Sequence, residues 1–331
     1  MIITRTPFRI SFFGGGTDYP IWFRENGGAV LATSIDKYCY IMCRKLPPFF
    51  DHKHRIVYSA IENVSKASEI RHPAVRGAFE WFGIETGLEI HHDGDLPARS
   101  GLGSSSSFSV GLLHALRALD GKISDKGQLA RDAIHLEQVV IGEAVGSQDQ
   151  VTAAYGGFNK IEFFADGSFS VSPVIVSAAR KSLLNDHLML FFTGISRIAA
   201  EVAQTKIDNL SNRRAELTRM RDMVDEGLGI LSDPSRPIDD FGHLLDAAWN
   251  FKRRLSSRVS TAAIDEIYTR SLREGALGGK LLGAGGGGFL LLFVPPENHE
   301  RVKQQLQPLV HVPFRFEDSG SRVVLYHPDG L

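Results

Sequence analysis

The sequence predicts an α+β fold in two domains, and three observations lead to this class. The chain has 331 residues, enough for two domains that each enclose a sizeable core. Strand-like segments with alternating apolar residues accompany helix-like segments whose apolar residues recur at i+3 and i+4. A glycine cluster at residues 283–288 leads into the β-rich run FLLLFVPP, not into a helix. This order argues against a dinucleotide-binding parallel sheet, although the glycine spacing matches GxGxxG.

Strands and helices are expected along the whole chain. In the N-terminal part they are strands within 1–45 and at 54–60, a helix at 72–82, an extended segment at 87–92, helices from about Ser104, at about 125–144 and up to Gly156, and strands at 158–164 and 167–176. In the C-terminal part they are a strand at 188–193, a helical region from 196 to about 231, helices at about 239–255 and 262–275, and paired strands at 279–283 and 288–294. A junction is expected around 181–187, which gives an N-terminal domain at 1–183 and a C-terminal domain at 184–331.

Composition and charge are those of an ordinary globular protein. Apolar residues make up 43% of the chain and charged residues 23%, and 37 basic against 38 acidic residues give a net charge of −1. This balance gives no bulk attraction to nucleic acid or to a membrane, and no apolar run reaches membrane-spanning length. The start MIITRTPFRI lacks the apolar core of a signal peptide, so we expect a cytoplasmic protein.

Side chains that ligate transition metals predict no dedicated site. Cys39 and Cys43 share one face of a strand-like segment, where buried and reduced thiols are expected. Histidines and aspartates gather at residues 91–95, but their spacing does not supply tetrahedral ligands.

The most informative segment is LPARSGLGSSSSFSVGLLHAL, at residues 96–116. Gly101 and Gly103 let the backbone approach a ligand closely, and the serines that follow are placed to cap an amphipathic helix. Unpaired amides at a helix start, with the positive end of the helix dipole, form an anion site. The segment therefore predicts a loop that binds phosphate.

The commoner phosphate-transfer signatures do not occur in this sequence. No segment fits GxxxxGK followed by Ser or Thr, and the nearest one, GALGGKLL from Gly275, places Leu281 after Lys280. The HRD and DFG signatures of protein kinases are missing as well.

Two further glycine-rich segments flank the loop in sequence, TPFRISFFGGGTDYP at residues 6–20 and GGKLLGAGGGGFLLLF at residues 278–293. In order, the three segments resemble motifs one, two and three of the GHMP kinases, the superfamily of galactokinase, homoserine kinase, mevalonate kinase and phosphomevalonate kinase. The resemblance covers essentially the whole chain. It implies a two-domain GHMP kinase fold with a ribosomal protein S5 domain 2-like N-terminal domain and a ferredoxin-like C-terminal domain.

Within this superfamily the sequence resembles the D-glycero-D-manno-heptose 7-phosphate kinases. The segments that carry this resemblance are GGGTDY, where galactokinases have GEHTDY, and SIDKY, IRHP, DQVTAAYGGFNKIEF and FTGISR. The resemblance implies transfer of the γ-phosphoryl group of ATP to the anomeric hydroxyl of a sugar phosphate, with Mg²⁺ as cofactor. A fucokinase-like enzyme that acts on an unphosphorylated sugar is the nearest alternative.

The resemblance also assigns residues to ATP and to the metal ion. The residues expected to bind ATP are Gly101, Leu102, Gly103, Ser104, Ser105 and Ser106. Ser105 and Glu137 match the family serine and glutamate that contact Mg²⁺, an ion that prefers oxygen ligands. Glu137 could instead be a solvated helix charge, but its spacing to Asp149 equals the corresponding spacing in galactokinases.

Asp149, in SQDQ, resembles the catalytic aspartate found as MDQ in galactokinases. Such a carboxylate can take the proton of the acceptor hydroxyl, or only orient that hydroxyl, because the transition state is loose. Asp149 could also cap a helix, although Ser147 is better placed to do so. Arg9 matches the motif-one arginine that lies against this aspartate, where it could stabilise transition-state charge.

For the sugar, Asp18 matches the family aspartate that accepts hydrogen bonds from ring hydroxyls. Gly15 and Gly16 stand where galactokinases have Glu and His, and they leave room for a different sugar. Tyr155, in the family-like segment, completes the expected substrate contacts.

A phosphate on the sugar would require a cation of its own. Arg197 is the first candidate, and Lys37 and Lys160 are alternatives. Two other functions remain open, because the superfamily includes diphosphomevalonate decarboxylases and a silent binding protein could keep the same fold. The GGGTDY form favours a sugar, and the family's catalytic and metal residues favour an active kinase.

Overall fold

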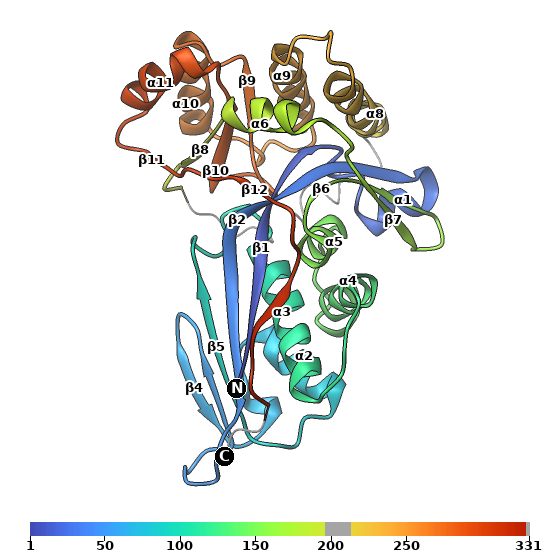
Figure 1. The fold of residues 1–331 in the computed structure, drawn as a ribbon, viewed down its shortest axis with the longest axis vertical. Coiled ribbons are helices and arrows are strands. Elements are labelled where there is room, and N and C mark those ends of the chain that lie inside the picture. The colour runs from blue at the N-terminus through green and yellow to red at the C-terminus, as the bar shows by residue number, and fades with distance from the viewer. Residues whose placement is uncertain (196–212, 329–331) are drawn as a thin grey trace.

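Two β-sheets organise the molecule, and the computed structural model describes residues 1–195 and 213–328 (Figure 1). The larger sheet is built on the long strand β2 (Gly28–Lys45), which pairs antiparallel with β1 (Ile2–Phe13). The other edge of β2 is shared, because its first part pairs with β6 (Phe158–Phe163) and its last part with β5 (Leu88–Gly94). The remaining strands of this sheet are β3 (His54–Val57), β4 (Ile61–Val64), β7 (Phe169–Pro173), β12 (Phe316–Glu317) and β13 (Arg322–Tyr326).

Helices α2 to α5 lie on one face of the larger sheet (Figure 1). They are α2 (Pro73–Phe82), α3 (Ser104–Leu119), α4 (Lys126–His135) and α5 (Gln148–Tyr155). Helix α3 packs on β1 and β2, and its backbone comes so close that the Thr4 hydroxyl donates to the Gly111 carbonyl at 2.9 Å. The expected helix at 125–144 is shorter, because α4 continues only as a π-helical turn, Leu136–Val140.

The smaller sheet has the ferredoxin-like arrangement that the resemblance implied. Its strands are β8 (Leu188–Phe192), β9 (Gly278–Leu281), β10 (Phe289–Phe293) and β11 (Val310–His311). The strand order is β11-β8-β10-β9, with antiparallel pairing throughout. The helices that accompany it are α8 (Arg214–Ser232), α9 (Asp239–Arg254), α10 (Ala262–Arg273) and α11 (His299–Gln305). Helices α8, α9 and α10 lie between β8 and β9, and α11 lies between β10 and β11, so the described elements follow the β-α-β-β-α-β pattern with additional helices in the first connection. This pattern and the strand order confirm the prediction for the C-terminal half.

Some features of the fold were not predicted. A short helix α1 (Pro20–Asn26) follows the first glycine cluster, and the expected junction segment forms a helix, α6 (Ala178–Asp186). Short 3-10 turns occur at Ala67–Glu69 and Pro296–Asn298. Strands β12 and β13 return from the C-terminal half and pair with β2 and β1, so Tyr326 of β13 lies beside Ile2 of β1 (Figure 1). The division at residues 183 and 184 stays a proposal.

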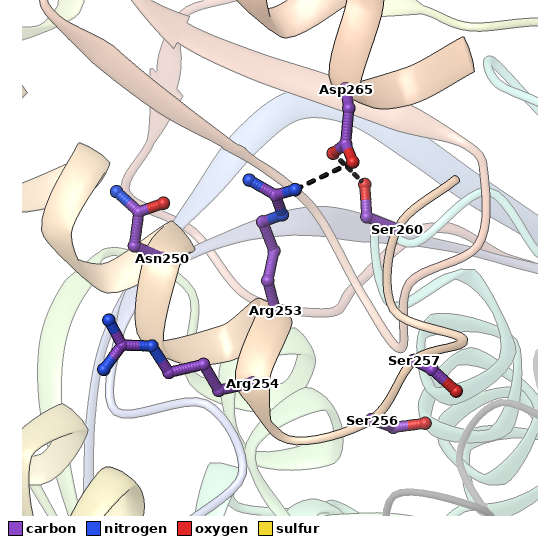
Figure 2. Close-up of a pocket in the computed structure, with 7 residues that line it drawn as sticks. All are labelled: Asn250, Arg253, Arg254, Ser256, Ser257, Ser260 and Asp265. Carbon is purple, nitrogen blue, oxygen red and sulfur yellow. Dashed lines mark hydrogen bonds and ion pairs between the residues drawn. The ribbon is translucent and has the colours of Figure 1, made fainter. Parts of the chain in front are cut away.

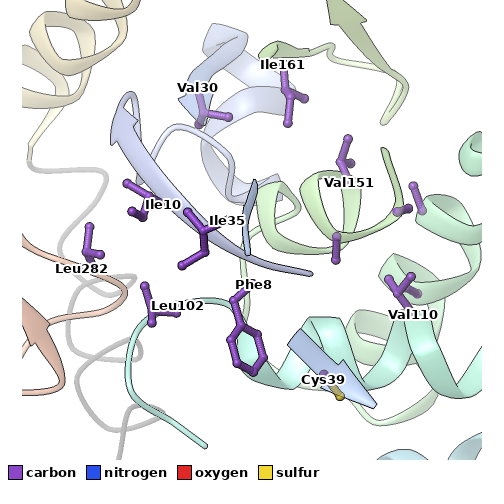
Figure 3. Close-up of a cluster of buried hydrophobic side chains, with 14 of the residues drawn as sticks. Phe8, Ile10, Val30, Ile35, Cys39, Leu102, Val110, Val151, Ile161 and Leu282 are labelled. Atoms are coloured by element: carbon purple, nitrogen blue, oxygen red, sulfur yellow. The ribbon is translucent and has the colours of Figure 1, made fainter. Parts of the chain in front are cut away.

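The core joins the glycine segments to the larger sheet. Leu102 and Leu282 are buried beside Ile10 and Ile35 (Figure 3). Because a fully buried leucine contributes roughly 2 kcal/mol, these two side chains anchor the turns that carry them. Both cysteines are buried and free, and none of the described helices is both long and apolar enough to cross a bilayer.

Candidate active site

Motif one holds the phosphate loop, residues 101–106, through its main chain. The Arg9 amide donates to the Leu102 carbonyl at 3.0 Å, and the Arg9 guanidinium donates to the Gly101 carbonyl at 2.7 Å. In a trans peptide the N–H points opposite to the C=O. The amides of Leu102 and Gly103 therefore point away from Arg9 and are available to a ligand.

Motif three supports the same loop from the other side. A Cβ atom on Gly283 would lie 2.4 Å from the Gly101 Cα atom, and one on Gly101 would lie 2.6 Å from the Leu282 carbonyl oxygen. The Phe289 amide donates to the Ser100 carbonyl at 3.1 Å. Only glycines permit this backbone contact, so the sequence places them at 101 and 283.

Helix α3 begins at Ser104 as predicted, but the prediction that serines cap it is wrong. Its N-cap is Gly103, in the left-handed conformation with φ 75°, and no side chain caps the first turn. The serine hydroxyls have other partners instead. The Ser106 hydroxyl donates to Glu137 at 3.0 Å, and the Ser107 hydroxyl donates to the Pro7 carbonyl at 2.9 Å. The first amides of α3 thus remain open to an anion.

Arg9 and Asp149 meet beside the phosphate loop. The Arg9 Nε and Nη2 atoms donate to the two Asp149 oxygens, each at 2.7 Å, a bidentate pair. The Arg9 side chain is 4% exposed and the Asp149 side chain 25%, so the carboxylate is the accessible member. A Cβ atom on Gly103 would lie 3.5 Å from the Asp149 carboxyl carbon, which places the pair directly against the loop.

Asp149 lies in the first turn of α5, and the prediction that Ser147 caps this helix is wrong. Ser147 occupies the N-cap position but makes no capping hydrogen bond. Its hydroxyl oxygen accepts instead from the Gln138 side chain at 3.0 Å. The orientation of Asp149 therefore comes from Arg9 and not from a serine cap.

Glu137 is a buried carboxylate behind the phosphate loop. It lies in the π-helical turn and accepts from Ser106 and from the amide of Gln150. Its Oε1 atom has no partner among the described residues, and burial raises the pKa of Glu137 to about 7. Ser105, the serine predicted to contact a metal ion, is exposed on the first turn of α3. Gln150 was missed in the sequence, although the DQ dipeptide contains it.

Asp18 is buried and ties motif one to the start of α5. Its Oδ1 atom accepts from the Gly16 amide at 2.8 Å, and its Oδ2 atom accepts from the Gln148 amide at 3.4 Å. A Cβ atom on Gly146 would lie 2.0 Å from Asp18 Oδ2, so a side chain at this position would displace the carboxylate. The structure thus places the Asp18 carboxylate beside Gln148, the residue before Asp149.

The other predicted substrate residues fall in two groups. Gly15 and Gly16 lie with Asp18, and a Cβ atom on Gly15 would be 3.6 Å from the Gln148 side chain. Tyr155 is not brought to this group. It ends α5, and its hydroxyl lies 3.2 Å from where a Cβ atom on Gly127 would be.

Two of the three cations predicted to bind the sugar phosphate, Lys37 and Lys160, pair with carboxylates. Lys160 pairs with Asp225 at 2.9 Å and with Glu162 at 3.1 Å. Lys37 pairs with the adjacent Asp36 at 3.1 Å. Arg197 lies outside the described residues.

A recess of about 380 Å³ lies where α9 ends and α10 begins, and neither Arg9 nor Asp149 lines it (Figure 2). It is lined by Asn250, Arg253, Arg254, Ser256, Ser257, Ser260 and Asp265. Arg253 and Ser260 both donate to Asp265, at 2.7 and 2.6 Å. Its charged groups are thus partly satisfied within the recess, and none of its residues was predicted to be functional.

Two domain models of one enzyme family match this chain. The sequence matches the GHMP kinases N terminal domain over residues 55–157 and the GHMP kinases C terminal domain over residues 234–309, together more than half of the chain. The chain belongs to the GHMP kinases. It is therefore an ATP-dependent phosphotransferase with an alcohol group as acceptor, as the three motifs predicted.

Individual relatives include kinases of several small molecules. The chain is 29% identical over 307 residues to the D-glycero-alpha-D-manno-heptose 7-phosphate kinase of Campylobacter jejuni, a match that covers 89% of this chain and 90% of the relative. It is 26% identical to the bifunctional fucokinase/GDP-fucose pyrophosphorylase of Arabidopsis thaliana, over 91% of this chain and 30% of that larger protein.

Solved structures show the same fold. A D-glycero-D-manno-heptose 1-phosphate kinase from Bacteriodes thetaiotaomicron superposes with a TM-score of 0.80 at 22% identity, over 99% of this chain and 100% of that one. Lactococcus lactis galactokinase complexed with galactose superposes with a TM-score of 0.74 at 18% identity, over 97% and 94% of the two chains. The two-domain GHMP kinase fold is thereby confirmed.

Proposed function

We propose that this GHMP kinase transfers the γ-phosphoryl group of ATP to the anomeric C1 hydroxyl of D-glycero-D-manno-heptose 7-phosphate. The product would be the 1,7-bisphosphate, a precursor for nucleotide-activated heptose in the cytoplasm. The observation that carries the proposed chemistry is the position of Asp149, held by Arg9 directly against Gly103 of the phosphate loop. The heptose kinase of Campylobacter jejuni, similar over nine-tenths of its length, supports the choice of sugar.

The transfer needs one proton acceptor and one leaving group. The C1 hydroxyl oxygen forms a bond to the γ-phosphorus as the bond from that phosphorus to the β,γ-bridging oxygen breaks, and ADP leaves. The hydroxyl proton passes to the Asp149 carboxylate and then to solvent, for which the exposure of this carboxylate leaves a path. Because the transition state is loose, Asp149 also contributes by positioning the hydroxyl.

The donor set behind the loop fits Mg²⁺. Glu137 offers the unpartnered Oε1 atom, and the Ser106 hydroxyl lies beside this carboxylate. Hard divalent cations bind such oxygen ligands and neutralise phosphate charge when ATP is present. We propose Glu137 as a metal ligand together with Ser105, the serine that the family pattern favours.

The residues proposed to bind the sugar phosphate include two glycines and one cation. Gly15 and Gly16 lie beside Asp18, the aspartate that the family pattern assigns to hydrogen bonds from sugar hydroxyls. Tyr155 stays part of the proposed substrate set only through the family pattern. Arg197 is proposed to bind the 7-phosphate, because Lys37 and Lys160 already pair with carboxylates.

The proposal predicts strong selectivity for a phosphorylated sugar. ADP release should be measured with heptose 7-phosphate, heptose 1-phosphate, free heptose, fucose, galactose and mevalonate. We expect kcat/KM for heptose 7-phosphate to exceed that for free heptose by about a hundredfold or more, because a cation left without its phosphate is costly. Arg197→Gln should raise KM for the sugar phosphate about tenfold and leave KM for ATP within twofold.

Each alternative has its own signature in this panel. Equal kcat/KM for fucose and heptose 7-phosphate would replace the heptose assignment with a fucokinase-like one, for which the Arabidopsis relative is the precedent. Absence of ATP turnover with every acceptor, despite ATP binding, would identify a silent binding protein.

A further inference from the structure

Two buried side chains beside Gly15 carry polar atoms without a hydrogen-bond partner. Ser11 of β1 is 7% exposed, and Gln148, the first residue of α5, is 9% exposed. The Ser11 hydroxyl oxygen and the Gln148 Oε1 atom are buried, and neither has a partner among the described residues. A buried polar group in this state costs roughly 1–3 kcal/mol, and a ligand that supplies the missing hydrogen bond offsets that cost.

Both side chains converge on Gly15. A Cβ atom on Gly15 would lie 3.5 Å from the Ser11 hydroxyl oxygen and 3.6 Å from the Gln148 Nε2 atom. In the part of the chain that the structure describes, no other atom outside residues 14–16 would lie within 4 Å of it. The hydrogen bonds that Gln148 makes there involve its main chain only. Two polar groups that the described protein does not use therefore border one space.

Strand β1 and helix α5 place this space next to the pair of Arg9 and Asp149. Ser11 follows Arg9 by two residues where the pairing of β1 with β2 is regular, so both side chains point to the same face of the sheet. Gln148 directly precedes Asp149, the carboxylate that Arg9 holds. The Gln148 amide donates to Asp18 Oδ2 at 3.4 Å. The space thus adjoins both carboxylates that are proposed to act on the sugar.

The chemistry of the two groups indicates what they bind. A hydroxyl and a carboxamide are neutral, and each can both donate and accept a hydrogen bond. A phosphate group is bound most strongly by cations, which neither residue supplies. A sugar hydroxyl also donates and accepts, so it can satisfy both groups at once.

We propose that Gln148 and Ser11 bind a ring hydroxyl of the sugar in the space beside Gly15 and thereby select the acceptor. The inference rests on the proposed function in one respect, that the acceptor is a sugar. Because Gln148 directly precedes Asp149, this contact fixes the sugar ring next to the carboxylate that receives the proton of the C1 hydroxyl. The absence of a side chain at Gly15 keeps the space open for the ring.

Three variants test this contact. Gln148→Met removes the hydrogen-bonding groups at nearly the same side-chain length, and Ser11→Ala removes the hydroxyl. Gly15→Ala instead fills the space, because both contacts of the new Cβ atom are at ordinary van der Waals distance. Gly229→Ala in α8 is the matched control, because nothing lies within 4 Å of a Cβ atom there.

Steady-state kinetics should be measured for ATP, for heptose 7-phosphate and for monodeoxy analogues that each lack one ring hydroxyl, together with the melting temperature. We expect Gln148→Met to raise KM for the sugar phosphate about tenfold and to leave KM for ATP within about twofold, as for loss of one hydrogen bond to the substrate. The analogue that lacks the bound hydroxyl should react equally well with Gln148→Met and with wild type.

The other variants should follow the same split between sugar and ATP. Ser11→Ala should raise KM for the sugar phosphate less than Gln148→Met does, Gly15→Ala should raise it at least as much, and Gly229→Ala should leave it unchanged. The melting temperatures of Gln148→Met and Ser11→Ala should stay at the wild-type value or above, because buried polar groups without partners are replaced by apolar ones.

A sugar KM within about twofold of wild type in Gln148→Met, or an equal loss for every monodeoxy analogue, would overturn the inference. A lowered melting temperature in both Gln148→Met and Ser11→Ala would overturn it as well, because the two groups would then have a structural role. Turnover of heptose 7-phosphate by wild type would leave the proposed function standing in either case. If wild type phosphorylates a different sugar instead, the proposed function fails, and the same comparison with that sugar and its deoxy analogues decides the inference.

Discussion

At the scale of single residues, Arg9 connects the parts that phosphoryl transfer needs. Its amide and its guanidinium hold the carbonyls of Leu102 and Gly101, and the same guanidinium holds both oxygens of Asp149. The phosphate loop and the Asp149 carboxylate are therefore both positioned by Arg9. Charge-assisted hydrogen bonds of this kind are about twice as strong as neutral ones, so the arrangement is set before substrate arrives.

Replacement of Asp149 by asparagine tests this role. Asp149→Asn keeps the size and one acceptor for Arg9 but removes the negative charge beside the acceptor hydroxyl. We expect kcat to fall about a hundredfold or more, with KM for ATP changed less than threefold, because positioned acid–base groups contribute at this level. Steady-state kinetics of ADP release, with melting temperature as the control for folding, measure the effect. Turnover near the wild-type rate would exclude Asp149 from catalysis.

Residue-level inference from the sequence succeeded where a motif fixes both type and spacing. Arg9 and Asp149 were predicted to meet, and they do. The serine caps failed, because Gly103 in the left-handed conformation already begins α3 and leaves the hydroxyls to other partners. Side-chain partners such as Gln150 depend on the π-helical turn, for which the sequence contains no local signal.

At the scale of elements, the glycine turns of motifs two and three work by direct backbone contact. Gly101 and Gly283 approach so closely that neither tolerates a Cβ atom, and Leu102 and Leu282 anchor both turns in the core. The turn after β9 therefore helps to position the phosphate loop through this backbone contact. This contact joins the C-terminal sheet to the nucleotide site through a few atoms.

The substitution Gly283→Ala should disturb nucleotide binding beyond its effect on stability. Gly283 has φ 70° and Gly121 has φ 68°, so alanine at either position carries the same left-handed strain of roughly 1 kcal/mol. Only Gly283 has a neighbour in the way, because nothing lies within 4 Å of a Cβ atom on Gly121. We expect KM for ATP to rise about tenfold or more in Gly283→Ala and to stay unchanged in Gly121→Ala. Equal kinetics in the two variants would show that the contact does not position the loop.

At the scale of the whole molecule, C-terminal strands complete the larger sheet that the N-terminal strands begin. Strands β12 and β13 follow the C-terminal layer and pair with β2 and β1, the strands that carry motif one. The Lys280 ammonium of β9 adds a bond to the Phe12 carbonyl of β1 at 2.7 Å. The two sheets are therefore linked at the site as well as by the chain, which suits an enzyme that assembles its active site from both halves.

The fold class could be predicted from the sequence pattern, and the ferredoxin-like layer followed from the family resemblance that the three glycine motifs carry. The return of β12 and β13 could not, because short and half-exposed strands have weak periodicity and their pairing is set by distant residues. Helix α1 escaped prediction for a related reason, since seven residues after a glycine turn give too short a pattern.

The central claim is that the γ-phosphoryl group of ATP goes to the anomeric hydroxyl of a sugar that already carries a 7-phosphate. Phosphorus-31 NMR of a reaction with ATP and D-glycero-D-manno-heptose 7-phosphate tests it most directly. We predict the signals of ADP and of a new phosphate coupled to the anomeric proton, with the original 7-phosphate signal retained in equal amount. An unchanged heptose 7-phosphate spectrum, under conditions where the same protein phosphorylates a free sugar, would contradict the account.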